Sequence, residues 1–408
     1  MITTGGESMI NVLWISLRVP YDTVRHASGK IHNYYLKELI KEPNVNLKLI
    51  TFCKKDEYEI AVNDHKTNNI DSDIYYWDVP LIAKAERALV RINPLDKYGG
   101  GTISYYWKKI EKSLKKLANI PNVIILDWTE MLLFLPKIKA IFPDAKYVSI
   151  EEDVLLLNFQ RQYESCKKGI KKQILRLKYR KLKQLELSML KGCDLVILNN
   201  PKDQQLVTRE GVKNTWYWSP YFQNLSSIQS GIKKNKNILY YGSMSRPENH
   251  FSVLHLINDI FPQIDDKEAK LIIVGNSPRE SLLQLQSERI IITGFVEDIS
   301  PYFESSLCLC APLILGAGVK IKIIEALSAG LTVLTNDIGI EGIPAKNGTD
   351  YIYCETDQDF IESLNDLLKD KIDTDQIGHN AKQFINKQYD IQKDAQTFIA
   401  YINSLADN

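Results

Sequence analysis

The residues best suited to chemistry follow a short apolar strand predicted at Leu307–Ala311. Gly316 and Gly318 come next in a loop, and glycines let backbone N–H groups approach a ligand closely. Lys320 and Lys322 then fall in the first turn of a predicted helix, where cations oppose the helix dipole unless an anion is bound there. The spacing therefore indicates a phosphate site at a helix N-terminus.

The same predicted helix, Val319–Ala329, carries a carboxylate beside these lysines. Glu325 follows Lys322 by three residues, so the two side chains share one helix face. A lysine for a diphosphate and a carboxylate for ribose hydroxyls suit a nucleotide. A second glycine-rich turn with Gly339 and Glu341 follows the next strand. The alternative is that Lys322 and Glu325 form only an exposed ion pair and that the glycines are only helix caps, which an isolated Gly-x-Gly motif would favour. The whole ordered run favours the nucleotide site.

Short apolar runs alternate with longer amphipathic stretches, which is typical of parallel sheets flanked by helices. Strands are predicted at Ile10–Leu17, Leu47–Phe52, Asn122–Leu126, Lys146–Ile150, Asp194–Leu198, Ile238–Tyr241, Lys270–Val274, Ile290–Thr293, Leu307–Ala311 and Thr332–Leu334. Helices are predicted at Ile31–Lys41, Ser104–Leu117, Lys171–Leu190, Phe251–Phe261, Val319–Ala329, Asp357–Leu368 and Ile391–Leu405. Ser219–Lys236 is predicted to be a linker. The pattern predicts two doubly wound α/β domains, with a ligand beyond the carboxyl ends of the strands, in the cleft between them.

The run from Gly316 to Leu327, with Gly330 and Gly339-Ile340-Glu341-Gly342, resembles the donor-site signature of group 1 glycosyltransferases. It is similar to a sugar-transferase subgroup with a Gly-Ala-Gly-Val-Lys donor loop. Shorter segments agree with this resemblance: Gly242-Ser243-Met244, Val274-Gly275 and Gly294-Phe295-Val296-Glu297-Asp298.

The resemblance implies the GT-B fold, in which two Rossmann-like doubly wound domains face a central cleft. Residues 9–220 are then the acceptor-side domain and residues 221–390 the nucleotide-sugar-binding domain. Residues 391–408 form a helix expected to pack back on the N-terminal domain.

The resemblance also implies a role for each matching residue. Lys322 would contact the donor diphosphate and stabilise the leaving nucleotide, and Glu325 would hold the ribose. Phe295 and Val296 lie where the nucleobase is held. Ser28 and Gly29, before the helix from Ile31, resemble a loop that closes over the diphosphate, or else they are an ordinary helix N-cap. The remaining expected donor-site residues are Gly316, Gly318, Lys320, Gly339 and Glu341.

The chain departs from the family pattern at three places. Ala317 stands where the first glutamate of the family's pair is expected, as it does in the subgroup. Ser243 and Asn249 stand where an arginine and a lysine are usual, with Arg246 nearby. Glu152–Asp153 replaces a His-Asp pair, so no catalytic base is identified. Phosphate binding is therefore expected to depend more heavily on the two lysines.

Composition excludes several other classes of protein. Lys+Arg 51 against Asp+Glu 50 leaves a net charge of +1, which argues against nucleic acid as a partner. The six cysteines and six histidines show no metal-ligand spacing. Asp71-Ser72-Asp73 is interpreted as a turn in an Asn/Asp-rich loop. No membrane span and no signal peptide are predicted, so we expect a cytoplasmic protein.

One segment is strongly basic. Lys167–Lys183 holds nine basic residues and no acidic one, with apolar residues at helical spacing. Such a helix either packs by its apolar face and leaves a solvated basic face, or meets an anionic membrane or a lipid-diphosphate acceptor.

The resemblance to group 1 glycosyltransferases implies an enzyme that moves a sugar from a nucleoside-diphosphate sugar, a UDP- or GDP-sugar, to a glycan or lipid-linked acceptor. Retention of configuration, independence of metal and no further cofactor are expected. The acceptor is expected to be a cell-surface glycan, made at the cytoplasmic face of the membrane. A non-catalytic GT-B protein that binds nucleotide sugar or stabilises a partner transferase is the alternative. A sugar-nucleotide epimerase fits the Gly316–Glu325 run poorly.

Overall fold

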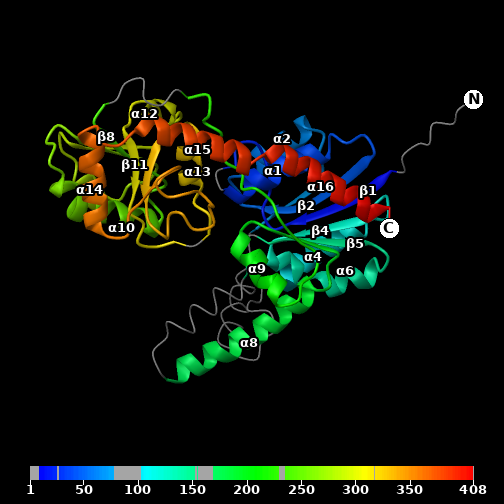
Figure 1. Ribbon diagram of the computed structural model, residues 1–408. Helices are drawn as coiled ribbons and strands as arrows, with labels where there is room; N and C mark the ends of the chain where they lie inside the picture. The colour runs from blue at the N-terminus through cyan, green and yellow to red at the C-terminus, as the bar shows by residue number, and fades with distance from the viewer. Residues whose placement is uncertain are drawn as a thin grey trace, which may run out of the picture. The chain divides into compact units, whose positions relative to one another are not determined.

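The computed structural model describes residues 9–24, 27–77, 103–151, 154, 169–228, 235–316 and 318–407. The chain divides into two compact units (Figure 1). The first comprises Met1–Tyr221 and Ile391–Asn408, and the second comprises Phe222–Asp390.

The first unit contains a seven-stranded parallel sheet in the order β3-β2-β1-β4-β5-β6-β7. Its strands are β1 Ile10–Ser16, β2 Val45–Cys53, β3 Asp71–Tyr76, β4 Val123–Asp127, β5 Lys146–Glu151, β6 Leu195–Leu198 and β7 Thr215–Tyr217. Helices cover it at α1 Ala27–Leu39, α2 Tyr58–Thr67, α4 Ile103–Leu114, α5 Thr129–Leu132, α6 Leu135–Ile141, α8 Ile170–Leu190, α9 Pro201–Arg209 and α16 Ile391–Ala406. The doubly wound architecture predicted from the sequence is confirmed.

The interpretation of Asp71-Ser72-Asp73 as a turn is wrong, because these residues begin the edge strand β3. Lys48 on β2 donates to Asp71 at 2.7 Å and to Asp73 at 3.1 Å. The lysine thus compensates charges that would otherwise disfavour a strand, and charged side chains are common on edge strands.

The C-terminal helix α16 packs within the first unit. Phe398 is fully buried, and its ring lies 5.7 Å from that of Tyr35 on α1 and 6.0 Å from that of Trp14 on β1. The Asp394 carboxylate accepts a hydrogen bond from the backbone N–H of Ser219 at 2.8 Å. The last residues of the chain therefore complete the core of the unit that its first residues begin.

The second unit contains a six-stranded parallel sheet in the order β10-β9-β8-β11-β12-β13. Its strands are β8 Asn237–Tyr241, β9 Lys270–Val274, β10 Ile290–Gly294, β11 Cys308–Ala311, β12 Thr332–Thr335 and β13 Ile352–Tyr353. Its α-helices are α10 Pro247–His255, α11 Glu280–Leu283, α12 Ser300–Glu304, α13 Ile321–Ala329, α14 Asp357–Leu368 and α15 Thr374–Gln388. A π-helical turn, Leu256–Ile260, and a 3₁₀ turn, Phe261–Gln263, continue α10.

Helix α13, which carries Lys322, is held closely against α15. A Cβ added at Gly378 of α15 would lie 2.1 Å from the carbonyl oxygen of Gly330, the left-handed C-cap of α13. Seven consecutive residues of α13, Ile323 to Ala329, are buried. Backbone contact between the two helices thus fixes α13 without leaving room for a side chain at the crossing.

Candidate functional site

The floor of the candidate site is backbone at the carboxyl ends of β8, β9 and β10. The N–H of Gly242 donates to Val274, and the N–H of Gly275 donates to Gly294, each at 3.0 Å. A Cβ added at Gly275 would lie 1.7 Å from the carbonyl oxygen of Gly242. Only glycine fits there, so the three strand ends pack closely enough to present main chain to a ligand.

Lys322 reaches this floor from α13. Its Nζ donates to the Asn249 Oδ1 at 2.5 Å and to the Tyr240 hydroxyl at 3.1 Å, and it lies 4.5 Å from the centre of the Tyr240 ring. Asn249 also donates through Nδ2 to the carbonyl of Ser243 at 2.9 Å. The asparagine at the position where a lysine was expected therefore holds Lys322 in place.

Burial, with smaller contributions from the charges of Arg246 and Lys320, lowers the pKa of Lys322 from 10.5 to about 7, and the charge of Glu248 opposes this shift. Within the described residues no carboxylate lies within ion-pair distance of its ammonium group. Removing a cation from water without a counter-charge is costly. An anion bound at the N-terminus of α13 would relieve that cost.

Lys320 lies just outside the helix, as the N-cap of α13, because the helix begins at Ile321. The prediction that Lys320 falls in the first helical turn is therefore wrong. Its Nζ donates to the carbonyl of Gly318 at 2.5 Å and lies 3.8 Å from a carboxylate oxygen of Glu341. A Cβ at Gly316 would lie 3.0 Å from the Lys320 side chain. The lysine thus shapes the loop between Gly316 and the helix; Ala317 is outside the described residues.

Glu325 is 9% exposed, and its carboxylate accepts a hydrogen bond from the backbone N–H of Gln223 at 3.2 Å. Burial, together with the negative charge of Glu325, raises the pKa of Tyr241. Lys322 and Glu325 share a face of α13, as their spacing predicts, but each has its own partners. The interpretation of the two as a simple exposed ion pair is wrong.

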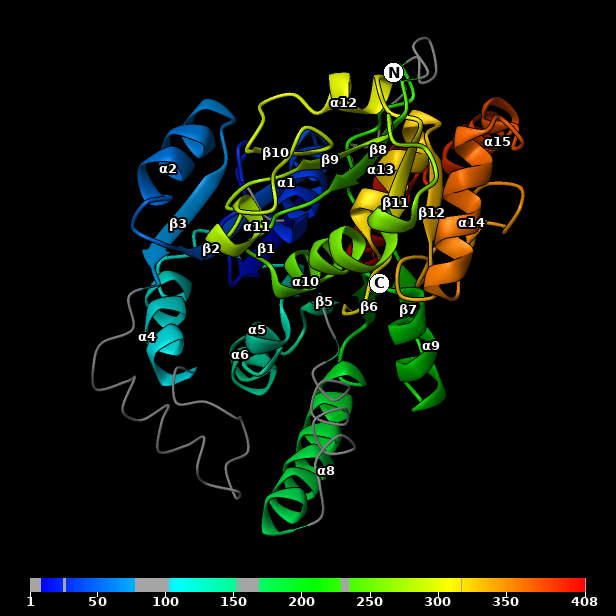
Figure 2. The same cartoon turned by 90° about the vertical axis from the view of Figure 1, so that its left-hand side faces the viewer.

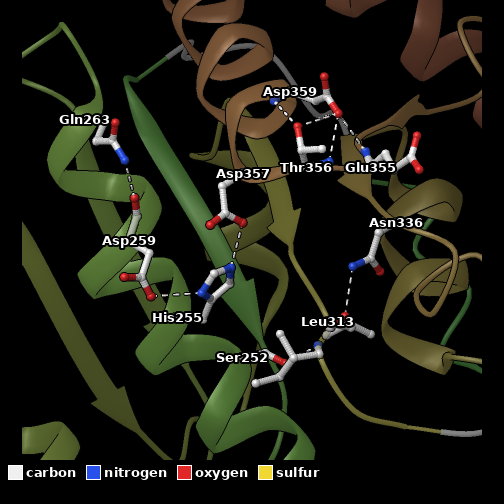
Figure 3. Close-up of polar contacts among 11 residues, drawn as sticks. Ser252, His255, Asp259, Gln263, Leu313, Asn336, Glu355, Thr356, Asp357 and Asp359 are labelled. Atoms are coloured by element: carbon white, nitrogen blue, oxygen red, sulfur yellow. Dashed lines mark hydrogen bonds and ion pairs between the residues drawn. The ribbon is translucent and has the colours of Figure 1, made fainter.

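The loops after β11 and β12 are tied to their surroundings by polar contacts (Figure 3). The Ser252 hydroxyl accepts from the N–H of Ile314 at 3.3 Å, and Asn336 donates to the carbonyl of Leu313 at 2.8 Å. The Asn336 Oδ1 accepts a hydrogen bond from the N–H of Gly339 at 3.2 Å. A Cβ added at Gly339 would lie 1.8 Å from the Thr335 hydroxyl oxygen. The chain leading to Gly316 and the turn at Gly339 are thereby positioned together.

Helix α14 is fixed to the same region of the second unit (Figure 3). His255 lies between two carboxylates, with Asp259 at 2.9 Å and Asp357 at 2.8 Å from its ring nitrogens. Thr356 and Asp359 form a reciprocal capping box at the start of α14.

The predicted nucleobase residues follow β10. Phe295 is 73% exposed, whereas Val296 packs against the core of the second unit. An exposed aromatic ring beside a glycine-lined strand end offers a surface on which a base can stack.

In the first unit, Gly29 is buried within the first turn of α1, which begins at Ala27. The prediction that Ser28 and Gly29 form a loop before a helix starting at Ile31 is therefore wrong. Glu152–Asp153, which stands in place of the family's His-Asp pair, lies outside the described residues.

Sequence reasoning missed the buried carboxyl of Glu151, at the end of β5. Burial and the charge of Glu186 raise its pKa to about 8, against hydrogen bonds donated by the Ser149 and Thr129 hydroxyls. The side chain is 1% exposed and is held by these two hydroxyl groups. In the sequence, the only signal for Glu151 was its position at the end of a predicted apolar strand.

The described residues contain no cluster of histidine, cysteine and carboxylate groups able to hold a metal ion. In the same ranges, none of the helices has both the length and the apolar character that crossing a membrane requires.

Comparison with known proteins agrees with this geometry. Residues 235–370 match the family model described as "Glycosyl transferases group 1". A stretch of 170 residues is 24% identical to the "Uncharacterized 44.6 kDa protein in cps region" of Klebsiella pneumoniae, covering 39% of this chain and 44% of that protein. The match thus spans less than half the length of this curated relative.

Two solved structures resemble the whole chain. Anabaena Alr3699/HepE in complex with UDP has a TM-score of 0.64 at 13% identity, over 97% of this chain and 100% of that one. Sucrose-phosphate synthase from Thermosynechococcus elongatus has a TM-score of 0.68 at 15% identity, over 98% and 100%. At such identities the likeness shows the fold alone. That fold is GT-B, with two Rossmann-like α/β domains.

Replacing Lys322 by Met should stabilise the second unit while removing its cation. Because the pKa of Lys322 is lower in the folded state, the unfolded chain binds more protons between pH 7 and 10.5, and the free energy of unfolding rises with pH in this range. The destabilisation caused by Lys322 is therefore largest at low pH. We expect a gain of about 2–4 kcal/mol at pH 6.5 and a smaller gain at pH 9. Calorimetric unfolding measures both; Lys346→Met, an exposed lysine of the same unit, is the control. Destabilisation at pH 6.5, or an equal gain at both pH values, would contradict the assignment.

Proposed function

We propose that the protein is a glycosyltransferase that transfers a sugar from a nucleoside-diphosphate sugar to a glycan or lipid-linked acceptor. The observation that carries the proposal is the partly buried Lys322, held by neutral partners at the N-terminus of α13. The match of residues 235–370 to group 1 glycosyltransferases supports it.

In the proposed reaction the bond between the anomeric carbon and the diphosphate oxygen breaks, and the acceptor hydroxyl oxygen forms the new glycosidic bond. The proton of that hydroxyl passes to the departing phosphate oxygen. Negative charge develops on the departing diphosphate. Lys322, in its protonated form, and the first N–H groups of α13 stabilise that charge. The step needs leaving-group stabilisation more than a strong base, which suits the retaining, metal-independent reaction that we propose.

The proposed donor is a UDP-sugar. Phe295 offers a stacking surface for the base, and Glu325 a carboxylate for the ribose hydroxyls. Gly316, Gly318, Lys320, Gly339 and Glu341 of the second unit would frame the diphosphate and sugar. Anabaena Alr3699/HepE, a protein of similar fold, is known in complex with UDP and with UDP-glucose.

The proposed role is cell-surface polysaccharide synthesis at the cytoplasmic face of the membrane. The Klebsiella pneumoniae relative is described as a protein of a cps region, which supports this setting.

Slow hydrolysis of the donor tests catalysis without requiring the acceptor. We expect purified protein to release UDP from UDP-glucose or another UDP-sugar, and Lys322→Met to reduce the rate at least about 100-fold, as loss of one charge-stabilising group does elsewhere. Lys346→Met should retain the full rate. Binding of UDP-sugar with no release of UDP, with or without glycan acceptors, would favour the non-catalytic alternative.

We also propose that α8 meets the anionic membrane surface. The helix extends away from the sheet of the first unit (Figures 1 and 2), and its first half exposes Leu177 at 51% and Ile174 at 37%. Leu187 and Leu190, near its end, are buried. The expectation of an apolar face packed along the whole basic segment is thus wrong for its first half. Residues 167–168 lie outside the described residues.

Vesicle binding tests the surface. Replacing Arg176 and Arg180 by Gln should weaken binding to vesicles containing phosphatidylglycerol about 30-fold, since each basic residue near such a surface contributes about 1 kcal/mol. Arg209→Gln, an exposed arginine on α9, should leave binding unchanged. Equal binding to neutral phosphatidylcholine vesicles, or an equal effect of Arg209→Gln, would overturn the proposal.

A further inference from the structure

Arg18 lies just beyond the carboxyl end of β1, between two tryptophans. The centre of its guanidinium group is 4.9 Å from the Trp77 ring and 5.0 Å from the Trp128 ring. Trp77 follows β3 and Trp128 follows β4, so three strands of the sheet build this arrangement. The Ser16 hydroxyl donates to the Arg18 carbonyl at 2.9 Å and fixes the backbone below it.

Two donors of this arrangement have no hydrogen-bond partner among the described residues, whereas the Trp77 indole N–H donates to the Tyr106 hydroxyl. Within the described part of the chain, the buried Arg18 Nε–H and the buried Trp128 Nε1–H have no hydrogen-bond acceptor. No carboxylate in these ranges forms an ion pair with Arg18. Buried donors in a folded protein are ordinarily paired, and an unpaired one costs free energy. Two such donors side by side call for an acceptor that the described chain does not supply.

The backbone at Trp128 is also unusual. Its φ of 80° and ψ of 141° fall in a region that residues with a side chain rarely adopt. The backbone N–H of Trp128 donates to Ile150 at 2.9 Å, so the strand ladder enforces this conformation and directs the indole to Arg18.

The neighbouring carboxyl group is already engaged. Asp127, which precedes Trp128, is fully buried and lies 2.9 Å from His32 and 3.3 Å from the Trp14 indole nitrogen. No ion pair joins Asp127 to Arg18 in the described chain, so the planar donor face of Arg18 is left for a ligand.

We propose that Arg18, with Trp77 and Trp128, forms an oxyanion-binding subsite that receives a phosphate or carboxylate group of the acceptor. A planar guanidinium binds both classes of oxyanion through paired N–H donors, and stacking on indole rings fixes its plane. The acceptor assignment rests on the proposed function; binding of the oxyanion does not.

The test observes Arg18 directly in the full chain labelled with ¹⁵N-arginine. Its Nε–H signal is identified by its loss in Arg18→Lys. UDP is present at saturation to occupy phosphate positions in the second unit. Methyl phosphate, glucuronate and neutral methyl glucoside are then titrated separately. We expect a saturable shift of this signal with methyl phosphate, with glucuronate or with both, and none with methyl glucoside.

The two anions distinguish the sources of the group. A response to methyl phosphate alone assigns a phosphorylated acceptor, and a response to glucuronate alone assigns a uronate-bearing glycan. Arg18→Gln should lower the affinity for the responding anion at least about ten-fold, because the paired N–H donors are lost. Tryptophan fluorescence measures this affinity, since all six tryptophans belong to the first unit. Arg209→Gln, on α9 of the same unit, should have no effect.

An Arg18 signal that responds no more to the two anions than to methyl glucoside would overturn the proposal. Equal loss of affinity in Arg209→Gln would overturn it as well, because binding would then reflect general surface charge. The readout requires no sugar transfer. A saturable shift in a protein that fails to hydrolyse donor would therefore support the subsite and count only against the proposed enzyme activity.

Discussion

The burial of one lysine ammonium group without a counter-charge is the constraint on which the second unit depends. Lys322 is held by the hydroxyl of Tyr240 and the amide of Asn249, which are neutral. The closely packed glycines at the strand ends, such as Gly242 and Gly275, let α13 approach and leave main chain facing the same space. The charged form of Lys322 costs free energy when no anion is nearby, and a bound anion would stabilise it. A site that holds a diphosphate requires such a cation.

The first unit presents a different arrangement at the carboxyl edge of its own sheet. Burial and the charge of Glu186 raise the pKa of Glu151 to about 8, and Asp127 is engaged by His32. The cation at this edge, Arg18, is flanked by aromatic rings. Among the described residues, this edge thus presents a guanidinium held between aromatic rings, an arrangement suited to an anionic acceptor. Both edges follow the general rule that doubly wound sheets bind ligands where their strands end.

Much of the fold follows from periodicity, because buried parallel strands are continuous apolar runs. Lys270–Val274 and Asp357–Leu368 have the bounds that their patterns predict. The edge strand at Asp71 was misread because its carboxylates are compensated by Lys48, a partner 23 residues away. Helix α15, Thr374–Gln388, was not predicted; its close contact with α13 depends on backbone approach at Gly378, which periodicity does not reveal.

The site was predictable where chemistry and local spacing coincide, as in the Gly316–Glu325 run. It was not predictable where residues distant in sequence meet. Asn249 lies 73 residues from Lys322, and Trp128 lies far from Arg18 along the chain. The start of α13 at Ile321 depends on the conformation of Lys320, whose side chain bonds back to Gly318. Such contacts are set by tertiary packing, so residue types alone do not indicate them.

The most direct test of this account is calorimetric titration of UDP-glucose across pH 6.5 to 9 in buffers of different ionisation enthalpy. Lys322 has a pKa of about 7 in the free protein, and a bound diphosphate must raise it. We therefore expect uptake of about one proton near pH 8 and an affinity that falls about ten-fold per pH unit above pH 7, both lost in Lys322→Met. Binding that is independent of pH and takes up no proton, or no binding at any pH, would contradict the central role of Lys322.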